Sequence, residues 1–171
     1  YGDDRWLLPE RRVDSLGLAY GYATQALGYR INRHEGKLTG LAAFGEPNLY
    51  ETIARHFRLD ADGQVHGDFP GYRSLGRMMV ELAEKAKPAD LAASIQKVLE
   101  DFILTAVIRL LDRHPVRHLA LSGGVFANVR LNQRLAEELP VDEVFVYPAM
   151  SDQGLAAGGV LNFLLESDGL E

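Results

Sequence analysis

Leu119-Ala120-Leu121-Ser122-Gly123-Gly124-Val125-Phe126-Ala127-Asn128 joins a short apolar run to a helical pattern through two adjacent glycines. The pattern predicts a strand over residues 118–121 and a helix over residues 125–139. Glycine has no Cβ, so a ligand can approach this backbone closely. A glycine pair between a strand and the start of a helix is a natural cradle for a phosphate or another anion.

A second junction of the same kind follows at Tyr147-Pro148-Ala149-Met150-Ser151-Asp152-Gln153-Gly154. It predicts a strand over residues 144–147 and a helix over residues 154–165, and the alternation indicates a parallel α/β core. Loops at the carboxyl ends of neighbouring parallel strands share one crevice. We therefore expect Gly123, Gly124 and Asp152 to face the same space, as a nucleotide with a metal ion requires. The alternatives are a tight turn at the glycines and a helix cap at Asp152.

The rest of the chain is predicted to be mostly helical, with a first helix capped by Asp14 or Ser15 and stopped by Gly28. We expect an irregular segment over residues 30–47, a short helix over 49–57, a hairpin over 57–66 and a helix over 74–85. A helix over 89–113 is long enough to lie across a sheet. We group these as an N-terminal segment with the first helix (1–27), a mostly helical insertion with a small hairpin (28–87) and an α/β nucleotide-binding core (88–171).

Composition narrows the class of protein. The 171 residues are 47% hydrophobic and 25% charged, with a net charge of −6 and no cysteine. The negative charge disfavours a nucleic-acid or membrane-surface role, and the lack of cysteine suits the cytoplasm. No apolar run reaches the roughly 20 residues that span a bilayer, and no signal peptide is visible. The opening without methionine leads us to expect a piece of a longer polypeptide.

Two patterns resemble metal sites but are better explained otherwise. His114 and His118 are four apart, but Pro115 ends the long helix between them, so they would not share a helical face. The segment beginning at Asp60 starts like a calcium loop, yet it lacks the glycine and the glutamate that such a loop needs. We interpret it as a hairpin turn with Gly63 in the left-handed conformation.

Three segments resemble the motifs of O-carbamoyltransferases of the nodulation and antibiotic-tailoring type. The first resembles their E-x-K-x-x-G-L-A-x-aromatic-G segment, and the others resemble S-G-G-V-x-x-N and P-x-x-x-D-x-G-L-x-x-G. They occur in the family's order over about residues 15–165, and they are Arg33-His34-Glu35-Gly36-Lys37-Leu38-Thr39-Gly40-Leu41-Ala42-Ala43-Phe44-Gly45, Leu121-Ser122-Gly123-Gly124-Val125-Phe126-Ala127-Asn128 and Pro148-Ala149-Met150-Ser151-Asp152-Gln153-Gly154-Leu155-Ala156-Ala157-Gly158.

The resemblance implies an α/β fold, a ribonuclease-H-like half of an actin-like ATPase domain with a mostly helical insertion. It implies ATP, a carbamoyl-adenylate intermediate made from carbamoyl phosphate in a separate domain, and a divalent metal, typically iron. The acceptor would be a hydroxyl of a small molecule or a glycan. The family's metal site also uses two histidines of the other half-domain. We therefore expect this chain alone to lack transferase activity, and its open crevice and sheet edge to make it self-associate.

Residue roles follow from the same resemblance. Gly123 and Gly124 would approach the nucleotide phosphates, and Asn128 would hydrogen-bond the nucleoside. Asp152 would bind the metal, while Glu35 and Lys37 would lie near the nucleotide. The sequence identifies no catalytic acid or base; His34 qualifies by residue type alone.

Other functions remain open at this point. The glycine signature is shared by tRNA threonylcarbamoyl transferases and hydrogenase-maturation carbamoyltransferases, although the segments at Glu35 and Asp152 favour the first interpretation. A non-enzymatic actin-like nucleotide-binding module and half of a sugar kinase are further alternatives.

Overall fold

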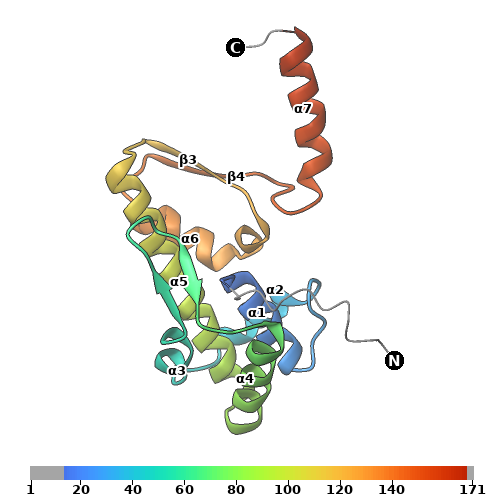
Figure 1. Ribbon diagram of the computed structural model, residues 1–171, viewed down its shortest axis with the longest axis vertical. Coiled ribbons are helices and arrows are strands. Elements are labelled where there is room, and N and C mark those ends of the chain that lie inside the picture. Colours follow the sequence, from blue (N-terminus) through green and yellow to red (C-terminus); the bar gives the residue numbers. More distant parts are fainter. Residues whose placement is uncertain (1–13, 169–171) are drawn as a thin grey trace. The chain divides into compact units, whose positions relative to one another are not determined.

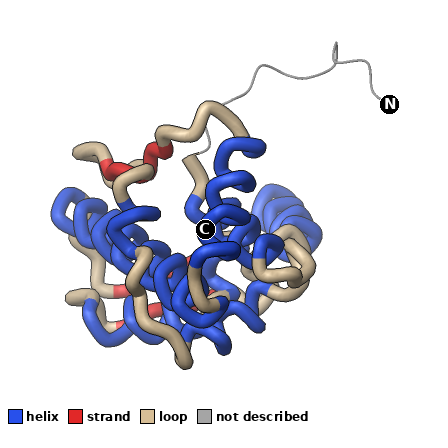
Figure 2. The backbone as a smooth tube through the Cα atoms, turned by 90° about the horizontal axis from the view of Figure 1, so that it is seen from below, coloured by secondary structure: helices blue, strands red, loops and turns tan. Residues whose placement is uncertain are grey.

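The computed structural model describes residues 14–168, which form a mixed α/β structure (Figure 1). Most of the described backbone is helical, and the strands are short (Figure 2). The chain divides after Pro115 into two compact units, a helical unit and an α/β unit. Each unit is taken separately below.

The first helix of the helical unit, α1 (Leu16–Ala26), begins where the sequence predicts. The Ser15 hydroxyl caps it by accepting a hydrogen bond from the Leu18 amide at 3.2 Å. Gly28 follows the helix with a φ of +80°, a conformation in which glycine carries no Cβ penalty. Asp14, the other candidate cap, instead accepts a hydrogen bond from the Gly67 amide at 2.8 Å.

The prediction of an irregular segment over residues 30–47 is wrong, because it contains helix α2 (Glu35–Ala42). Gly36 and Gly40 lower the intrinsic helix propensity of this stretch. The fully buried Leu38 compensates by packing into the core of the unit. Tertiary packing thus overrides the local preference.

The expected short helix and hairpin are both present, as α3 (Tyr50–Ala54), β1 (Phe57–Leu59) and β2 (Val65–Gly67). The two strands pair antiparallel, with Phe57 opposite Gly67. Gly63 adopts the predicted left-handed conformation with a φ of +79°. The Asp60 carboxylate organises the turn by accepting hydrogen bonds from the amides of Asp62 and Gln64, both at 2.9 Å.

Asp60 also makes this turn sensitive to acid. The hydrogen bond to the His66 ring, at 2.7 Å, together with the turn amides, lowers the pKa of the Asp60 carboxyl below its ordinary value. The unfolded hairpin therefore takes up this proton more readily than the folded one, and the stabilisation is lost as the pH falls through the lowered pKa. In an NMR pH titration we expect Asp60 to titrate below the ordinary aspartate value of about 3.9.

Two histidine variants test this assignment. Replacing His66 by alanine should raise the Asp60 midpoint. Replacing His56, which pairs with Asp68 at 2.9 Å, should leave it in place. An Asp60 midpoint that is the same with and without His66 would contradict the assignment.

Helices α4 (Tyr72–Lys85) and α5 (Pro88–Arg113) complete the helical unit, close to the predicted bounds. The expectation that the long helix lies across a sheet is wrong within this unit. Helix α5 packs mainly against α1, α2 and α3, and the hairpin contacts its C-terminal half. Its apolar face forms the centre of the core through Leu91, Ile95, Val98 and Leu99.

The α/β unit contains the two predicted parallel strands, β3 (His118–Leu121) and β4 (Glu143–Val146). His118 lies opposite Glu143 and Leu121 opposite Val146. The helix predicted over residues 125–139 is divided into a 3-10 turn, η2 (Gly124–Ala127), and helix α6 (Val129–Glu138). The division lies at Asn128, whose extended backbone (φ −79°, ψ 100°) interrupts the helical hydrogen bonding and lets its side chain cap α6.

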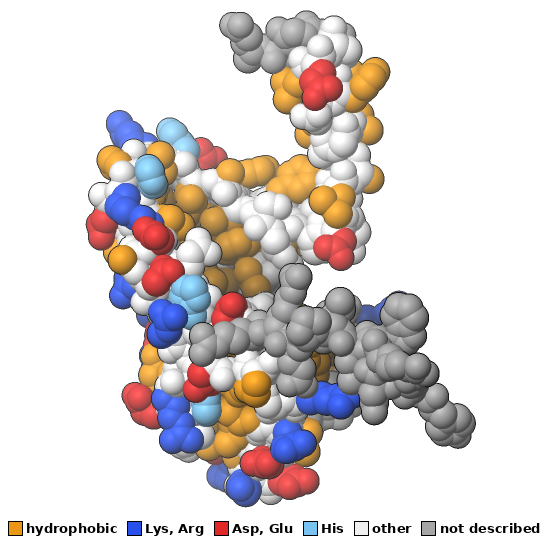
Figure 3. Space-filling model, viewed as in Figure 1, with side chains coloured by type: hydrophobic (Ala, Val, Ile, Leu, Met, Phe, Trp, Pro, Cys, Tyr) orange, Lys and Arg blue, Asp and Glu red, His pale blue; other side chains and the backbone are white. Residues whose placement is uncertain are grey.

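Helix α7 (Gly154–Asp168) follows β4 and is apolar around its whole circumference. Its apolar side chains lie on the surface (Figure 3), and the large ones are Leu155, Val160, Leu161, Phe163, Leu164 and Leu165. Such all-round apolarity is typical of a helix that packs on more than one side. Among residues 14–168, no helix combines the length and apolarity needed to cross a bilayer.

The boundary between the units differs from the grouping made on the sequence. Contacts place α5 with the helices before Pro115, whereas the sequence grouping placed residues 88–115 with the α/β core. The interpretation of residues 28–87 as an insertion stays a prediction. Residues 1–13 of the N-terminal segment lie outside the described residues.

Candidate functional site

The two strand-to-helix loops of the α/β unit meet at the carboxyl ends of β3 and β4. The Gly123 amide donates a hydrogen bond to the Met150 carbonyl at 2.6 Å, and the Ser122 hydroxyl donates to the same oxygen at 3.3 Å. One residue earlier, the Tyr147 amide donates to the Leu121 carbonyl at 3.3 Å, which continues the strand pairing into the loops. The expectation that these two loops share one space is confirmed.

The backbone at the glycine pair is open. Gly123 has a φ of +122° and a ψ of 151°, a combination essentially restricted to glycine. A Cβ at Gly123 would have the Phe126 ring at 3.8 Å as its nearest neighbour, and one at Gly124 would have the Ser151 Cβ at 4.0 Å. A ligand can therefore reach this backbone. The Gly123 amide, however, is already used in the bond to Met150, so it ties the loops together as well as facing the open space.

Asn128 has a structural role in this loop. Its side-chain oxygen accepts a hydrogen bond from the Leu131 amide at 3.0 Å and so caps α6. Sequence analysis missed Asn132, one turn further along, whose amide group donates to the Phe126 carbonyl at 2.7 Å and closes the 3-10 turn. The Asn132 side-chain oxygen is buried and has no hydrogen-bond partner among the described residues. The spacing of Asn128 and Asn132 by four residues was the available signal.

Asp152 lies in the second loop with its side chain exposed. Its backbone carbonyl accepts a hydrogen bond from the Leu155 amide at 3.2 Å, so the residue also starts α7. Gly154 is required by the shape of this loop, because a Cβ there would lie 2.3 Å from the Ala149 carbonyl oxygen. Within the described part of the chain, no three or more histidine, aspartate or glutamate side chains are grouped to hold a metal ion.

Glu35 and Lys37 lie on α2 in the helical unit. A Glu35 carboxylate oxygen accepts a hydrogen bond from the Asn32 amide at 2.5 Å, which fixes the turn before α2. The Lys37 ammonium lies 5.7 Å from the centre of the Tyr29 ring. His34, the base suggested by residue type, accepts a hydrogen bond from the Arg30 amide at 3.1 Å through Nδ1. All three side chains thus take part in local structure.

The glycine that ends this first motif, Gly45, lies directly against α5. A Cβ at Gly45 would lie 2.0 Å from the Ala89 carbonyl oxygen and 2.7 Å from the Asp90 nitrogen. Next to it, the Glu46 amide donates to the Asp90 carboxylate at 3.0 Å. This motif therefore joins α2 to the N-terminus of α5, a role that the sequence pattern did not reveal.

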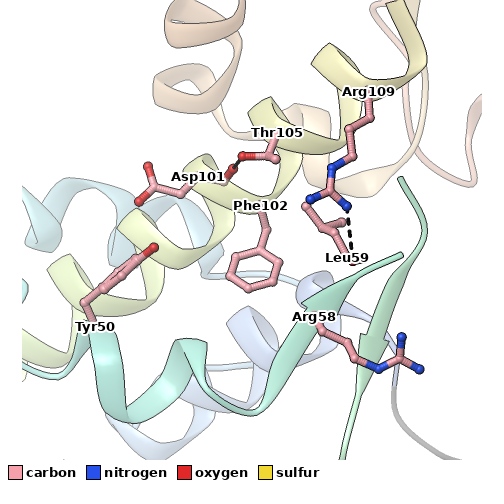
Figure 4. Close-up of a pocket in the computed structure, with 7 residues that line it drawn as sticks. All are labelled: Tyr50, Arg58, Leu59, Asp101, Phe102, Thr105 and Arg109. Atoms are coloured by element: carbon pink, nitrogen blue, oxygen red, sulfur yellow. Dashed lines mark hydrogen bonds between the residues drawn. The ribbon is translucent and has the colours of Figure 1, made fainter. Parts of the chain in front are cut away.

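A separate cavity of about 260 Å³ lies in the helical unit between α3, β1 and α5 (Figure 4). Its arginines are not directed at a common point. The Arg109 guanidinium donates to the Leu59 and Asp60 carbonyls at 3.1 and 2.5 Å, and the Arg58 side chain points away from Phe102. These contacts dock the hairpin onto α5, which is a structural function.

The geometry thus defines a class first: an α/β protein with a ligand-accessible glycine loop beside a carboxylate loop at the ends of parallel strands. A family model described as the carbamoyltransferase N-terminus matches residues 2–161. The chain belongs to this carbamoyltransferase family.

Individual relatives agree with the family match. Nodulation protein NolNO of Sinorhizobium fredii is 33% identical over 156 residues, which cover 86% of this chain and 22% of that protein. An uncharacterized protein of Methanocaldococcus jannaschii is 32% identical over 152 residues, 86% of this chain and 25% of that protein. A tRNA N6-adenosine threonylcarbamoyltransferase of Listeria innocua is 30% identical over 170 residues, 92% of this chain and 48% of that protein. The chain therefore spans about a quarter to a half of these relatives.

Proposed function

We propose that this chain is the nucleotide- and metal-binding part of an ATP-dependent O-carbamoyltransferase. The whole protein would transfer a carbamoyl group from carbamoyl-adenylate to an acceptor hydroxyl. The observation that carries the proposal is the hydrogen bond between Gly123 and Met150, which holds the glycine loop beside the Asp152 loop in a chain of the carbamoyltransferase family. We propose in addition that the fold is a ribonuclease-H-like half of an actin-like ATPase domain.

In this proposal the chain's own residues bind and orient the nucleotide. The open backbone of Gly123 and Gly124 receives the phosphates, because no side chain blocks the approach. Asn128 contacts the nucleoside, and Glu35 and Lys37 contribute from α2. Holding carbamoyl-adenylate away from water and in line with the acceptor hydroxyl removes much of the entropic barrier to transfer.

Asp152 would be one ligand of a divalent metal, iron in our proposal. An exposed carboxylate at the end of a strand suits this role, and the other ligands would come from outside the described residues. When bound, the metal supplies Lewis-acid stabilisation of charge that develops on the carbonyl oxygen or the departing phosphate.

Calorimetric titration of the whole protein tests the proposal. We expect heat on adding ATP, a further signal with carbamoyl phosphate, and dependence of turnover on Fe(II). The acceptor in this proposal is a hydroxyl-bearing small molecule or glycan. Binding of ATP without any response to carbamoyl phosphate would instead favour an actin-like module without transferase activity.

The Asp152→Ala variant tests the metal ligand directly. We expect iron retained after purification to fall at least about tenfold, because a missing ligand leaves an open and weakly bound metal. Metal content is measured by mass spectrometry, independently of activity. Asp142→Ala is the matched control, since Asp142 is an exposed aspartate of the same unit that pairs with Arg117 at 2.5 Å. Iron content unchanged in Asp152→Ala rules out the ligand role.

A second candidate is a threonylcarbamoyl transferase that acts on tRNA. The observation in its favour is the Listeria innocua relative, whose match covers 92% of this chain. The net charge of −6 argues against tRNA binding by this part of the protein. Transfer of labelled carbamoyl from carbamoyl phosphate to a small hydroxyl compound would support the first candidate, and labelling of tRNA only with threonine present would support the second.

A further inference from the structure

A buried chain of polar side chains crosses the core of the helical unit and joins α1, α5 and α2. The Tyr20 hydroxyl donates to the Gln96 side-chain oxygen at 2.8 Å, and the Gln96 amide donates to the Glu100 carboxylate at 2.7 Å. The Tyr20 oxygen also lies 2.9 Å from the Thr39 hydroxyl of α2. Tyr20, Gln96 and Glu100 are 4%, 6% and 8% exposed, so this network lies within the core.

Such a network restricts the geometry of the three helices. A buried amide or carboxylate costs free energy unless it is hydrogen-bonded, and apolar residues would fill these positions of α5 without that cost. The bonds form only when α1, α2 and α5 have this mutual arrangement. A rotation of α2 about its axis would break the contact between Thr39 and Tyr20. The network therefore fixes α2 more strictly than apolar packing of Leu38 alone.

The opposite face of α2 presents Lys37 to solvent. Gly36 and Gly40 flank it, and a Cβ at either glycine would meet nothing within 4 Å. The network ends within the same two turns, because the Thr39 hydroxyl lies 3.3 Å from the Glu35 carbonyl. The inner face of α2 is thus held by buried hydrogen bonds, and its outer face carries an accessible cation beside bare backbone.

We propose that Tyr20 is a positioning residue for nucleotide binding, which acts through Thr39 and Gln96 to hold α2 and thereby orient Lys37 toward the ATP phosphates. The inference rests on the proposed function, because Lys37 needs a nucleotide to bind. Tyr20 itself is buried in the core and touches no ligand.

The experiment is a double-variant cycle in the whole protein, with ATP affinity measured by calorimetry. Tyr20→Phe removes only the hydroxyl, and we expect ATP to bind about tenfold more weakly. The matched control is Thr24→Val, which removes a fully buried hydroxyl from the same helix that bonds only the Tyr20 carbonyl among printed contacts, at 2.9 Å. Thermal unfolding is measured in parallel, and we expect both variants to lose similar stability but only Tyr20→Phe to lose ATP affinity.

The second arm combines Tyr20→Phe with Lys37→Ala. If Tyr20 acts through Lys37, the double variant binds ATP no more weakly than Lys37→Ala alone, within about twofold. Additive losses, equal losses in Tyr20→Phe and Thr24→Val, or no effect of Lys37→Ala would each overturn the inference and leave the glycine-loop proposal standing. Absence of ATP binding by the unaltered protein would instead overturn the proposed function, and the inference with it.

Discussion

Replacing Gly45 by alanine should destabilise the helical unit by more than about 3 kcal/mol. The added Cβ would lie 2.0 Å from the Ala89 carbonyl oxygen, 2.2 Å from its carbon and 2.7 Å from the Asp90 nitrogen. All three are backbone atoms at the start of α5, so no side-chain rotation relieves the clash. The loop must move away, which also breaks the bond from the Glu46 amide to the Asp90 carboxylate.

The measurement is urea unfolding of the protein, with hydrogen exchange to locate the loosened segment in α2 and at the start of α5. Gly40→Ala is the matched control, because Gly40 belongs to the same motif and a Cβ there meets nothing within 4 Å. Alanine should stabilise α2 at that position by up to about 1 kcal/mol. A Gly45→Ala protein as stable as the unaltered one would show that α2 does not contact α5 in this way.

Replacing Gly123 by alanine should both strain the glycine loop and weaken ATP binding by at least about tenfold. Its backbone, at φ +122° and ψ 151°, costs a residue with a Cβ about 1–3 kcal/mol. The loop would relax to another conformation and lose the 2.6 Å bond to Met150. The Asp152 loop would then separate from the glycine loop, so iron retention should fall together with ATP affinity.

Gly124→Ala separates the structural effect from the effect on the ligand. Its Cβ would meet only the Ser151 Cβ, at 4.0 Å, which is an ordinary contact, so stability should not change. If the phosphates occupy the open space, the same methyl group obstructs them, and ATP affinity should fall while the thermal midpoint stays. Unaltered ATP binding in Gly124→Ala would remove the glycine pair from the nucleotide site.

The motifs that point to function in the sequence are used for structure as well. Gly45 and Gly154 are required by backbone contacts, Asn128 caps α6, and Glu35 fixes a turn. These roles explain the residue types without any ligand, and they are compatible with one. The variants that separate the two contributions are therefore those at Gly124, Lys37 and Asp152, where the structure places no comparable constraint.

The sequence by itself determined the features that depend on neighbouring residues. These include the parallel strands β3 and β4, the cap of α1 at Ser15, the hairpin with Gly63 and the long helix α5. Each follows from a periodicity, a cap or a turn residue within a few positions. That logic also predicted that the loops after β3 and β4 would meet, because parallel strands place their carboxyl ends together.

Only the tertiary structure decided the features that join distant residues. Helix α2 forms despite two glycines because Leu38 is buried by the rest of the unit, and α5 lies among helices because α1, α2 and α3 cover it. The contact of Gly45 with Ala89 and the bonds from Tyr20 to Gln96 and Thr39 join positions 19 to 76 residues apart. Local propensity contains no information about such partners, since their energy arises only when packing brings them together.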